Sequence, residues 1–74
     1  MEIYKVKDNK LEKMRIWKNL TQADVANVLG VDLNEYRNIE KGGKVDKKKV
    51  NKLSNFFNVS IFQMFYKSTK GDLW

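Results

Sequence analysis

The segment 41–52 (KGGKVDKKKVNK) holds the side chains whose type and spacing are best suited to chemistry with a partner. It contains six lysines and one aspartate, a net +5, and so carries most of the chain's formal charge of +6. Such a segment is either a solvated lysine face or a binding surface for an anionic polymer or surface. Charge alone leaves both readings open.

The sequence offers little for catalysis or metal binding. It has no histidine and no cysteine, which excludes disulfides, zinc fingers and thiol or imidazole catalysis and indicates a reducing compartment. The carboxylates Asp24, Glu35 and Glu40 occupy helix-cap or pairing positions rather than a cluster. We therefore expect no enzymatic activity, no cofactor, no metal and no small-molecule effector.

The length of 74 residues predicts one domain, spanning 1–74, with no room for a second module. The first residues, MEIYKVKD, lack the apolar run of a signal peptide, and no window is apolar enough to cross a membrane. We therefore expect a cytoplasmic protein that does not contact membranes.

Signals for the start and the end of helices recur along the chain. Capping boxes, with a polar cap and an acid or amide three residues later, are predicted at Thr21–Asp24, Asp32–Glu35 and Ser60–Gln63. Apolar pairs at the spacing of a hydrophobic staple are Leu20–Val25, Val31–Tyr36, Val45–Val50 (around Asp46, which lacks the box) and Val59–Met64. Helix ends are predicted at Asn19, Gly30, Gly42 and Asn58, because Asn and Gly tolerate the left-handed conformation.

These signals predict an all-α fold with five helices, at about 9–18, 22–29, 33–40, 47–57 and 61–66. Apolar residues at helical spacing predict the core: Leu11, Met14, Val25, Ala26, Leu29, Val31, Tyr36, Ile39, Val50, Leu53, Phe57, Met64 and Phe65. Ile16 and Trp17 fall outside this set, and we expect the N-terminal residues Ile3, Tyr4 and Val6 to cover them. Val28 and Trp74 have no assigned partner.

Helices 22–29 and 33–40 are joined only by Gly30-Val31-Asp32. So short a connection predicts that the second helix crosses the first steeply, with the small Ala26 at the point of closest approach. This is the arrangement of a helix-turn-helix, in which the outer face of the second helix can enter a DNA major groove.

The stretches TQADVANVLGV, YRNIEKG and FFNVSIFQMF resemble the phage repressor and Cro family, also called Xre-like, over about residues 9–66, with short extensions at both ends. The resemblance implies a compact, five-helix, lambda-repressor-like domain. It also implies a structural ion pair between Arg15 on the first helix and Glu40 at the end of the third.

The same resemblance implies which residues meet DNA. Candidates for reading bases are Leu33, Asn34, Arg37 and Asn38, since asparagine matches adenine, arginine matches guanine, and leucine packs on a thymine methyl group. Candidates for phosphate contacts are Thr21, Gln22, Lys41, Lys44, Lys47, Lys48 and Lys49. Glu35 and Leu33 depart from the family pattern, and we expect Glu35 to be engaged in its cap.

The last three of these lysines would fill the first turn of helix 47–57. At that position the helix dipole disfavours each lysine's positive charge by about 0.3–1 kcal/mol. DNA phosphates facing that turn would offset this unfavourable interaction between the lysines and the helix dipole.

The resemblance implies a sequence-specific, double-stranded DNA-binding transcriptional regulator of the Cro or repressor type, from a bacterium, phage or mobile element. Such regulators bind palindromic operators as homodimers, and Phe56, Phe62 and Tyr66 are the candidates for the dimer contact. The alternative is a protein-interaction module of the same fold, similar to an antitoxin or anti-repressor. An RNA-binding role lacks an obvious stacking platform.

Overall fold

A computed structural model describes residues 2–68, which form five helices and three short strands. The elements are β1 (Ile3–Val6), α1 (Lys10–Trp17), α2 (Gln22–Leu29), α3 (Leu33–Glu40), β2 (Val45–Asp46), α4 (Lys47–Phe57), α5 (Ile61–Met64) and β3 (Phe65–Lys67). The predicted bounds of α2, α3 and α4 are confirmed, and α1 is one residue shorter than expected at each end.

The helix starts follow the predicted caps in most details. Thr21 and Asp24 form the full capping box, with the Thr21 side chain accepting from the Asp24 N–H and the Asp24 carboxylate accepting from the Thr21 N–H. At α5, Gln63 Oε1 accepts from the Ser60 N–H at 2.8 Å. At α3, Asp32 accepts from the Glu35 N–H at 2.8 Å, but the Glu35 side chain does not reach back, so the expected box is only half formed.

The helix ends are confirmed at all four predicted positions. Asn19, Gly30, Gly42 and Asn58 have positive φ angles between 57° and 100°. After each, the next residue's N–H bonds to a carbonyl five residues back, as in the pair Gly43 N–H to Asn38 C=O at 2.7 Å. This Schellman arrangement satisfies the last carbonyls of α1 to α4 and turns the chain sharply.

The prediction of an all-α fold is wrong, because β1, near the start of the described chain, pairs antiparallel with both β2 and β3 in a sheet of order β2-β1-β3. Tyr4 lies opposite Val45 on one side and Lys67 on the other. The expected last helix, 61–66, therefore ends at Met64, and Phe65 begins β3. Pairing between segments far apart in the chain outweighs the local helical pattern here.

The sheet contributes to the core instead of covering α1. Tyr4 and Val6 on β1 are 3% and 7% exposed and join the main hydrophobic cluster. Ile16 and Trp17 on α1 remain 56% and 79% exposed, so the expectation that the N-terminal segment covers them is wrong. Trp74 lies outside the described residues.

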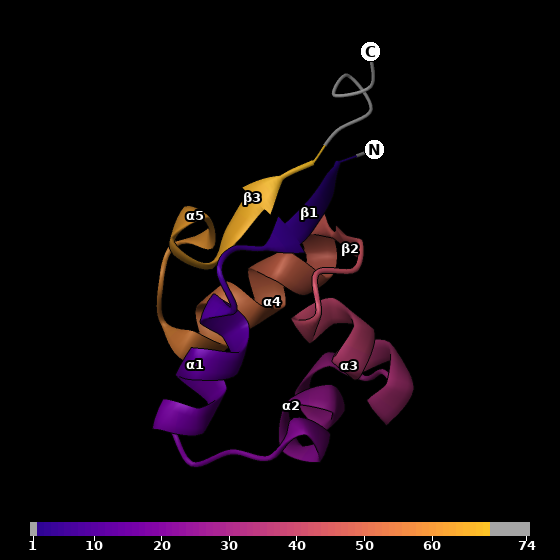
Figure 1. Ribbon diagram of the computed structural model, residues 1–74, viewed down its shortest axis with the longest axis vertical. Coiled ribbons are helices and arrows are strands. Elements are labelled where there is room, and N and C mark those ends of the chain that lie inside the picture. The colour runs from indigo at the N-terminus through magenta and orange to yellow at the C-terminus, as the bar shows by residue number, and fades with distance from the viewer. Residues whose placement is uncertain (1, 69–74) are drawn as a thin grey trace.

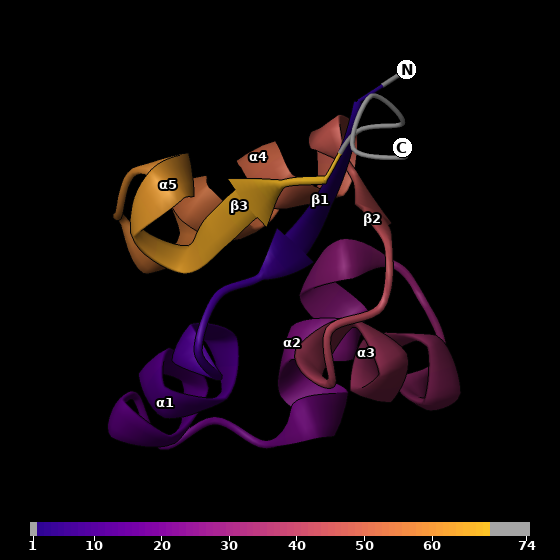
Figure 2. The same cartoon turned by 45° about the horizontal axis from the view of Figure 1, so that its top comes forward.

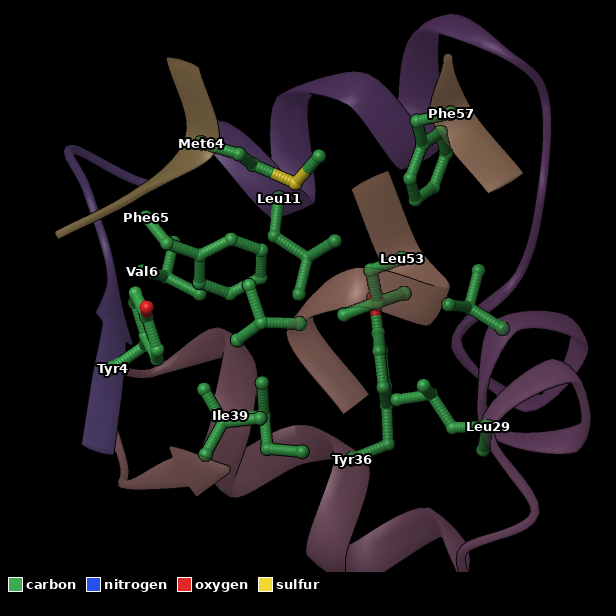
Figure 3. Close-up of a cluster of buried hydrophobic side chains, with 14 residues drawn as sticks. Tyr4, Val6, Leu11, Leu29, Tyr36, Ile39, Leu53, Phe57, Met64 and Phe65 are labelled. Atoms are coloured by element: carbon green, nitrogen blue, oxygen red, sulfur yellow. The ribbon is translucent and has the colours of Figure 1, made fainter. Parts of the chain in front are cut away.

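All the predicted core residues lie in the cluster or pack against it. Met14 and Val31 are half-buried, and the others are buried. Figure 3 shows the ring of Tyr36 reaching from α3 into the cluster, while Tyr4, Val6 and Phe65 approach from the side of the strands. The same residues that define the helices therefore join the helical part to the sheet.

The molecule places α2 and α3 at one end and the sheet at the other (Figures 1 and 2). α4 runs beneath the sheet, and α5 lies beside β3, so α5 is remote from the turn between α2 and α3. None of the helices in residues 2–68 has the length and apolarity that crossing a membrane requires.

Replacing Tyr4 by Ala tests whether β1 belongs to the core. Removal of a buried aromatic ring costs about 3–5 kcal/mol, so we expect a loss of this size in the free energy of unfolding measured by urea denaturation. Trp17→Ala, at an aromatic residue that is 79% exposed, is the control and should change stability by less than about 0.5 kcal/mol. Equal effects from the two variants would contradict the described packing.

Candidate nucleic-acid interface

The connection between α2 and α3 holds the two helices in a crossed arrangement (Figure 2). Gly30 has a φ of +74°, a conformation that costs glycine nothing. The next N–H, of Val31, bonds to the carbonyl of Ala26 at 3.1 Å. Ala26 itself is 3% exposed, so its small side chain lies in the packed interior. These contacts keep one face of α3 against the body and leave the opposite face outside.

A buried carboxylate joins α1, α2 and α3. Glu40, at the end of α3, is 6% exposed. Its Oε2 accepts from Arg15 Nε at 2.6 Å and from the Tyr36 hydroxyl at 2.6 Å, and its Oε1 accepts from Gln22 Nε2 at 3.0 Å. Arg15 Nη1 also donates to the Leu20 carbonyl at 2.9 Å. The pair that the resemblance implied is thus part of a larger network.

The network determines the ionisation of its members. Burial by itself would raise the pKa of Glu40, but hydrogen bonds from Arg15, Tyr36 and Gln22 outweigh it and leave that pKa below its ordinary value. The hydrogen bond to Glu40 raises the pKa of Arg15. Burial, followed by the hydrogen bond to Glu40, raises the pKa of the Tyr36 hydroxyl well above its usual range. Glu40 and Arg15 are therefore charged and Tyr36 neutral at neutral pH.

Gln22 connects this buried network to the outer surface of α3. While its Nε2 donates to Glu40, its Oε1 accepts from Arg37 Nε at 3.2 Å. Gln22 is half-buried and Arg37 is exposed. A base-reading candidate and a phosphate candidate therefore lie in direct contact.

The outer face of α3 presents the other base-reading candidates. Asn34 and Asn38 are exposed and Leu33 is half-buried, whereas Tyr36 and Ile39 are buried on the inner face. Glu35 is exposed as well, and the expectation that its side chain is engaged in the cap is wrong. The face therefore combines amide, guanidinium and apolar groups with one carboxylate.

An open groove runs from this face along the segment after α3. Its lining consists of Glu35, Asn38, Ile39, Lys41, Gly42, Gly43 and Lys44. Gly42 has a φ of +100°, and a Cβ on Gly43 would lie 2.8 Å from the Asn38 carbonyl oxygen. The two glycines let the chain pass close behind α3, which brings Lys41 and Lys44 next to Asn38.

The lysines predicted to bind phosphate fall into two groups. Lys47 Nζ lies 3.5 Å from Glu2 and Lys49 Nζ lies 3.5 Å from Asp46. Lys41, Lys44 and Lys48 are exposed and form no ion pair within residues 2–68. Exposed or partly exposed pairs of this kind are worth at most about 1 kcal/mol, so their carboxylate partners do not prevent Lys47 and Lys49 from contacting another anion.

The start of α4 also has an internal compensation for its positive charge. The Asp46 side chain accepts from the Lys49 N–H at 3.0 Å, and this hydrogen bond and the nearby Lys49 ammonium lower the pKa of Asp46. A charged N-cap carboxylate opposes the repulsion between the helix dipole and the lysines. The dipole argument for bound phosphates is therefore weaker than the sequence alone indicated.

The candidate dimer residues lie away from α3. Phe56 on α4, Phe62 on α5 and Tyr66 on β3 are 41%, 58% and 45% exposed. Phe62 also packs on Tyr4 of β1, with ring centroids 6.3 Å apart. Figures 1 and 2 place α5 and β3 at the end of the molecule opposite the α2–α3 turn, which separates Phe62 and Tyr66 from the groove. Phe56, on α4, does not line the groove either.

Sequence reasoning missed the Tyr36 hydroxyl and the bridging role of Gln22. Tyr36 was placed in the core as an apolar residue, yet its hydroxyl must find a partner when buried. The only sequence signal was that Tyr36 and Glu40 are four residues apart, the spacing of neighbours on one helix face. Nothing local predicts that Gln22 contacts α3, because that contact depends on how the helices cross.

Comparisons with known proteins agree with this geometry. A family model described as "Helix-turn-helix" matches residues 11–63. A solved structure titled "Crystal structure of transcriptional regulator VanUg, Form II" superimposes with a TM-score of 0.67, covering 95% of this chain and 93% of that one at 16% identity. At that identity the likeness concerns the fold. No curated protein sequence matches the chain.

Replacing Glu40 by Gln tests the network through pH. The depressed pKa means that Glu40 stabilises the fold at pH values above its unfolded pKa of about 4.3, and that this contribution is lost as pH falls through the folded pKa. We expect Glu40→Gln to lower the free energy of unfolding at pH 7 by about 3–5 kcal/mol. The difference from the wild type should shrink below about pH 4.

The control is Glu12→Gln, which removes the same charge from an exposed position on α1. It should cost at most about 1 kcal/mol, the scale of an interaction with the helix dipole. Denaturant titrations at several pH values measure both variants. A Glu40→Gln penalty that does not change between pH 7 and pH 3 would contradict the assigned ionisation.

Proposed function

This chain belongs to the Cro/C1-type helix-turn-helix family, and on that premise we propose that it is a transcriptional regulator that binds double-stranded DNA. α3 enters the major groove of an operator, and the lysines that follow it bind the DNA backbone. The observation that carries the proposal is the groove beside α3, where the exposed amide of Asn38 adjoins Lys41 and Lys44.

Base recognition is assigned to the outer face of α3. Asn34 and Asn38 are exposed one turn apart on the same helix, and each has the donor and acceptor that match the N6 and N7 atoms of adenine. Arg37 has the donors that match guanine, and Leu33 has the apolar surface that packs on a thymine methyl group. The inner face of the same helix is occupied by the core, so the bases would meet these groups and the exposed Glu35 carboxylate.

Phosphate contacts are assigned to the two sides of α3. Thr21 lies at the N-cap of α2, where exposed N–H groups favour anions. Gln22 follows it, but its amide is already engaged by Glu40 and Arg37, so Thr21 is the stronger phosphate candidate on this side. On the other side, Lys41 and Lys44 follow α3, and Lys47, Lys48 and Lys49 begin α4. Lys41, Lys44 and Lys48, which are exposed and form no ion pair within residues 2–68, are the strongest of these candidates. Their contacts to phosphate would release counterions without first breaking an ion pair.

We assign the Phe56, Phe62 and Tyr66 surface to contact between two copies of the chain. A single helix of eight residues reads few base pairs, and a two-fold dimer doubles the site that is read. Because this surface lies away from α3, it is compatible with simultaneous DNA binding. Occupation of an operator by such a dimer would repress transcription by excluding polymerase.

Selection from a pool of random duplexes, followed by sequencing, tests the proposal. We expect an enriched palindrome with half-sites about 34–36 Å apart, or a multiple of one helical turn. Asn38→Ala should weaken binding to that site by about 1–3 kcal/mol and relax the preference at one base pair in each half-site. Recovery of no enriched sequence would overturn the proposal and favour a protein-interaction role.

Salt titration of the selected site provides the second arm of this experiment. Lys48→Ala should reduce the slope of log K against log salt by about 0.9 per protomer, with equal effects on specific and random duplexes. Lys10→Ala removes an exposed lysine at the first turn of α1 and is the matched control. An unchanged slope for Lys48→Ala would exclude that lysine from the backbone contact.

A further inference from the structure

The side chain of Gln22 lies between a buried anion and an exposed cation. Its Nε2 donates to Glu40 Oε1 at 3.0 Å, and its Oε1 accepts from Arg37 Nε at 3.2 Å. Glu40 is held in turn by Arg15 and Tyr36, both at 2.6 Å. A continuous chain of hydrogen bonds therefore runs from α1 through the interior to the outer face of α3.

In this series of hydrogen bonds, the buried groups are held in place by packing, whereas the exposed group at the outer end is not. Glu40 and Tyr36 are 6% and 0% exposed, so packing fixes their positions. The donation to Glu40 orients the Gln22 amide, with its nitrogen toward Glu40 and its oxygen toward Arg37. Arg37, by contrast, is exposed, and an arginine side chain loses up to about 2 kcal/mol of conformational entropy when it is held in one position.

We propose that Gln22 is a specificity-determining residue, which positions Arg37 to read guanine. The inference rests on the DNA-binding function proposed above, and it gives Gln22 a role other than the phosphate contact that the resemblance implied. Within residues 2–68, the Arg37 side chain makes its one hydrogen bond through Nε. The two terminal nitrogens then remain for the O6 and N7 atoms of guanine, a bidentate match that Arg makes with this base.

The positioning role and the phosphate role predict different effects of a Gln22 substitution on DNA binding. A phosphate ligand contributes affinity without sequence information, so its removal weakens binding to all duplexes equally. A residue that orients Arg37 affects only the base pair that Arg37 reads. It also becomes irrelevant once Arg37 is removed, so the effects of the two substitutions are not additive.

The test is a selection from random duplexes with the wild type, Gln22→Met, Arg37→Met and the double variant. Arg37→Met should lose the guanine preference at one position of each half-site. Gln22→Met should lower the discrimination at that same position by about three- to tenfold, and the double variant should lose no more than Arg37→Met. Gln63→Met makes the same chemical change on α5 and should leave every preference unchanged.

Loss of the donor to Glu40 also affects folding, so each variant is first checked by thermal unfolding. If Gln22→Met does not fold, Gln22→Lys keeps a donor for Glu40 and removes the acceptor for Arg37, and it should show the same confined loss of preference. A uniform loss of affinity, or independent effects of Gln22 and Arg37, would overturn the inference while leaving the proposed function intact. Absence of any enriched site for the wild type would instead overturn the proposed function.

Discussion

The arrangement of the three N-terminal helices depends on one buried negative charge. Moving a carboxylate out of water costs several kcal/mol, and an ion pair with one arginine does not by itself recover that cost. Glu40 is tolerated because Arg15, Tyr36 and Gln22 all donate to it, each from a different position in the fold. The donors satisfy the charge only when α1, α2 and α3 cross as they do, so the need to satisfy Glu40 selects this arrangement over other helical packings.

The same constraint separates a rigid scaffold from an adaptable surface. Buried Tyr36 and Ile39 fix the rotation of α3, which leaves the side chains of Asn34 and Asn38 outside, where they hold no part of the described structure together. The lysines lie on the segment after α3 and at the start of α4, where the charged Asp46 cap offsets part of their repulsion. Apart from Gln22, which contacts both Glu40 and Arg37, stability and the proposed recognition thus use different residues, and the outward-facing residues of α3 can change without loss of the fold.

Local signals predicted the first four helices to within one residue at each end. They did not predict the long-range pairing, which ends α5 at Met64 instead of residue 66. Gly30, Gly42, Asn19 and Asn58 end their helices where expected, because a left-handed residue is favourable at few other places. The sheet was missed because β1 has four residues, and its strands are stable only when distant segments pair. For the candidate site, exposure on α3 followed from helical periodicity, but the contact of Gln22 with Glu40 and Arg37 depends on tertiary geometry.

The central claim is that the outer face of α3 meets the base pairs. The most direct measurement is a titration of the ¹⁵N-labelled protein with its selected duplex, following the side-chain amide signals of Asn34 and Asn38 by NMR. We expect large shifts of these signals on the specific duplex and much smaller shifts on a random duplex of equal length. Unchanged Asn34 and Asn38 signals, with shifts concentrated on α5 and β3, would contradict it.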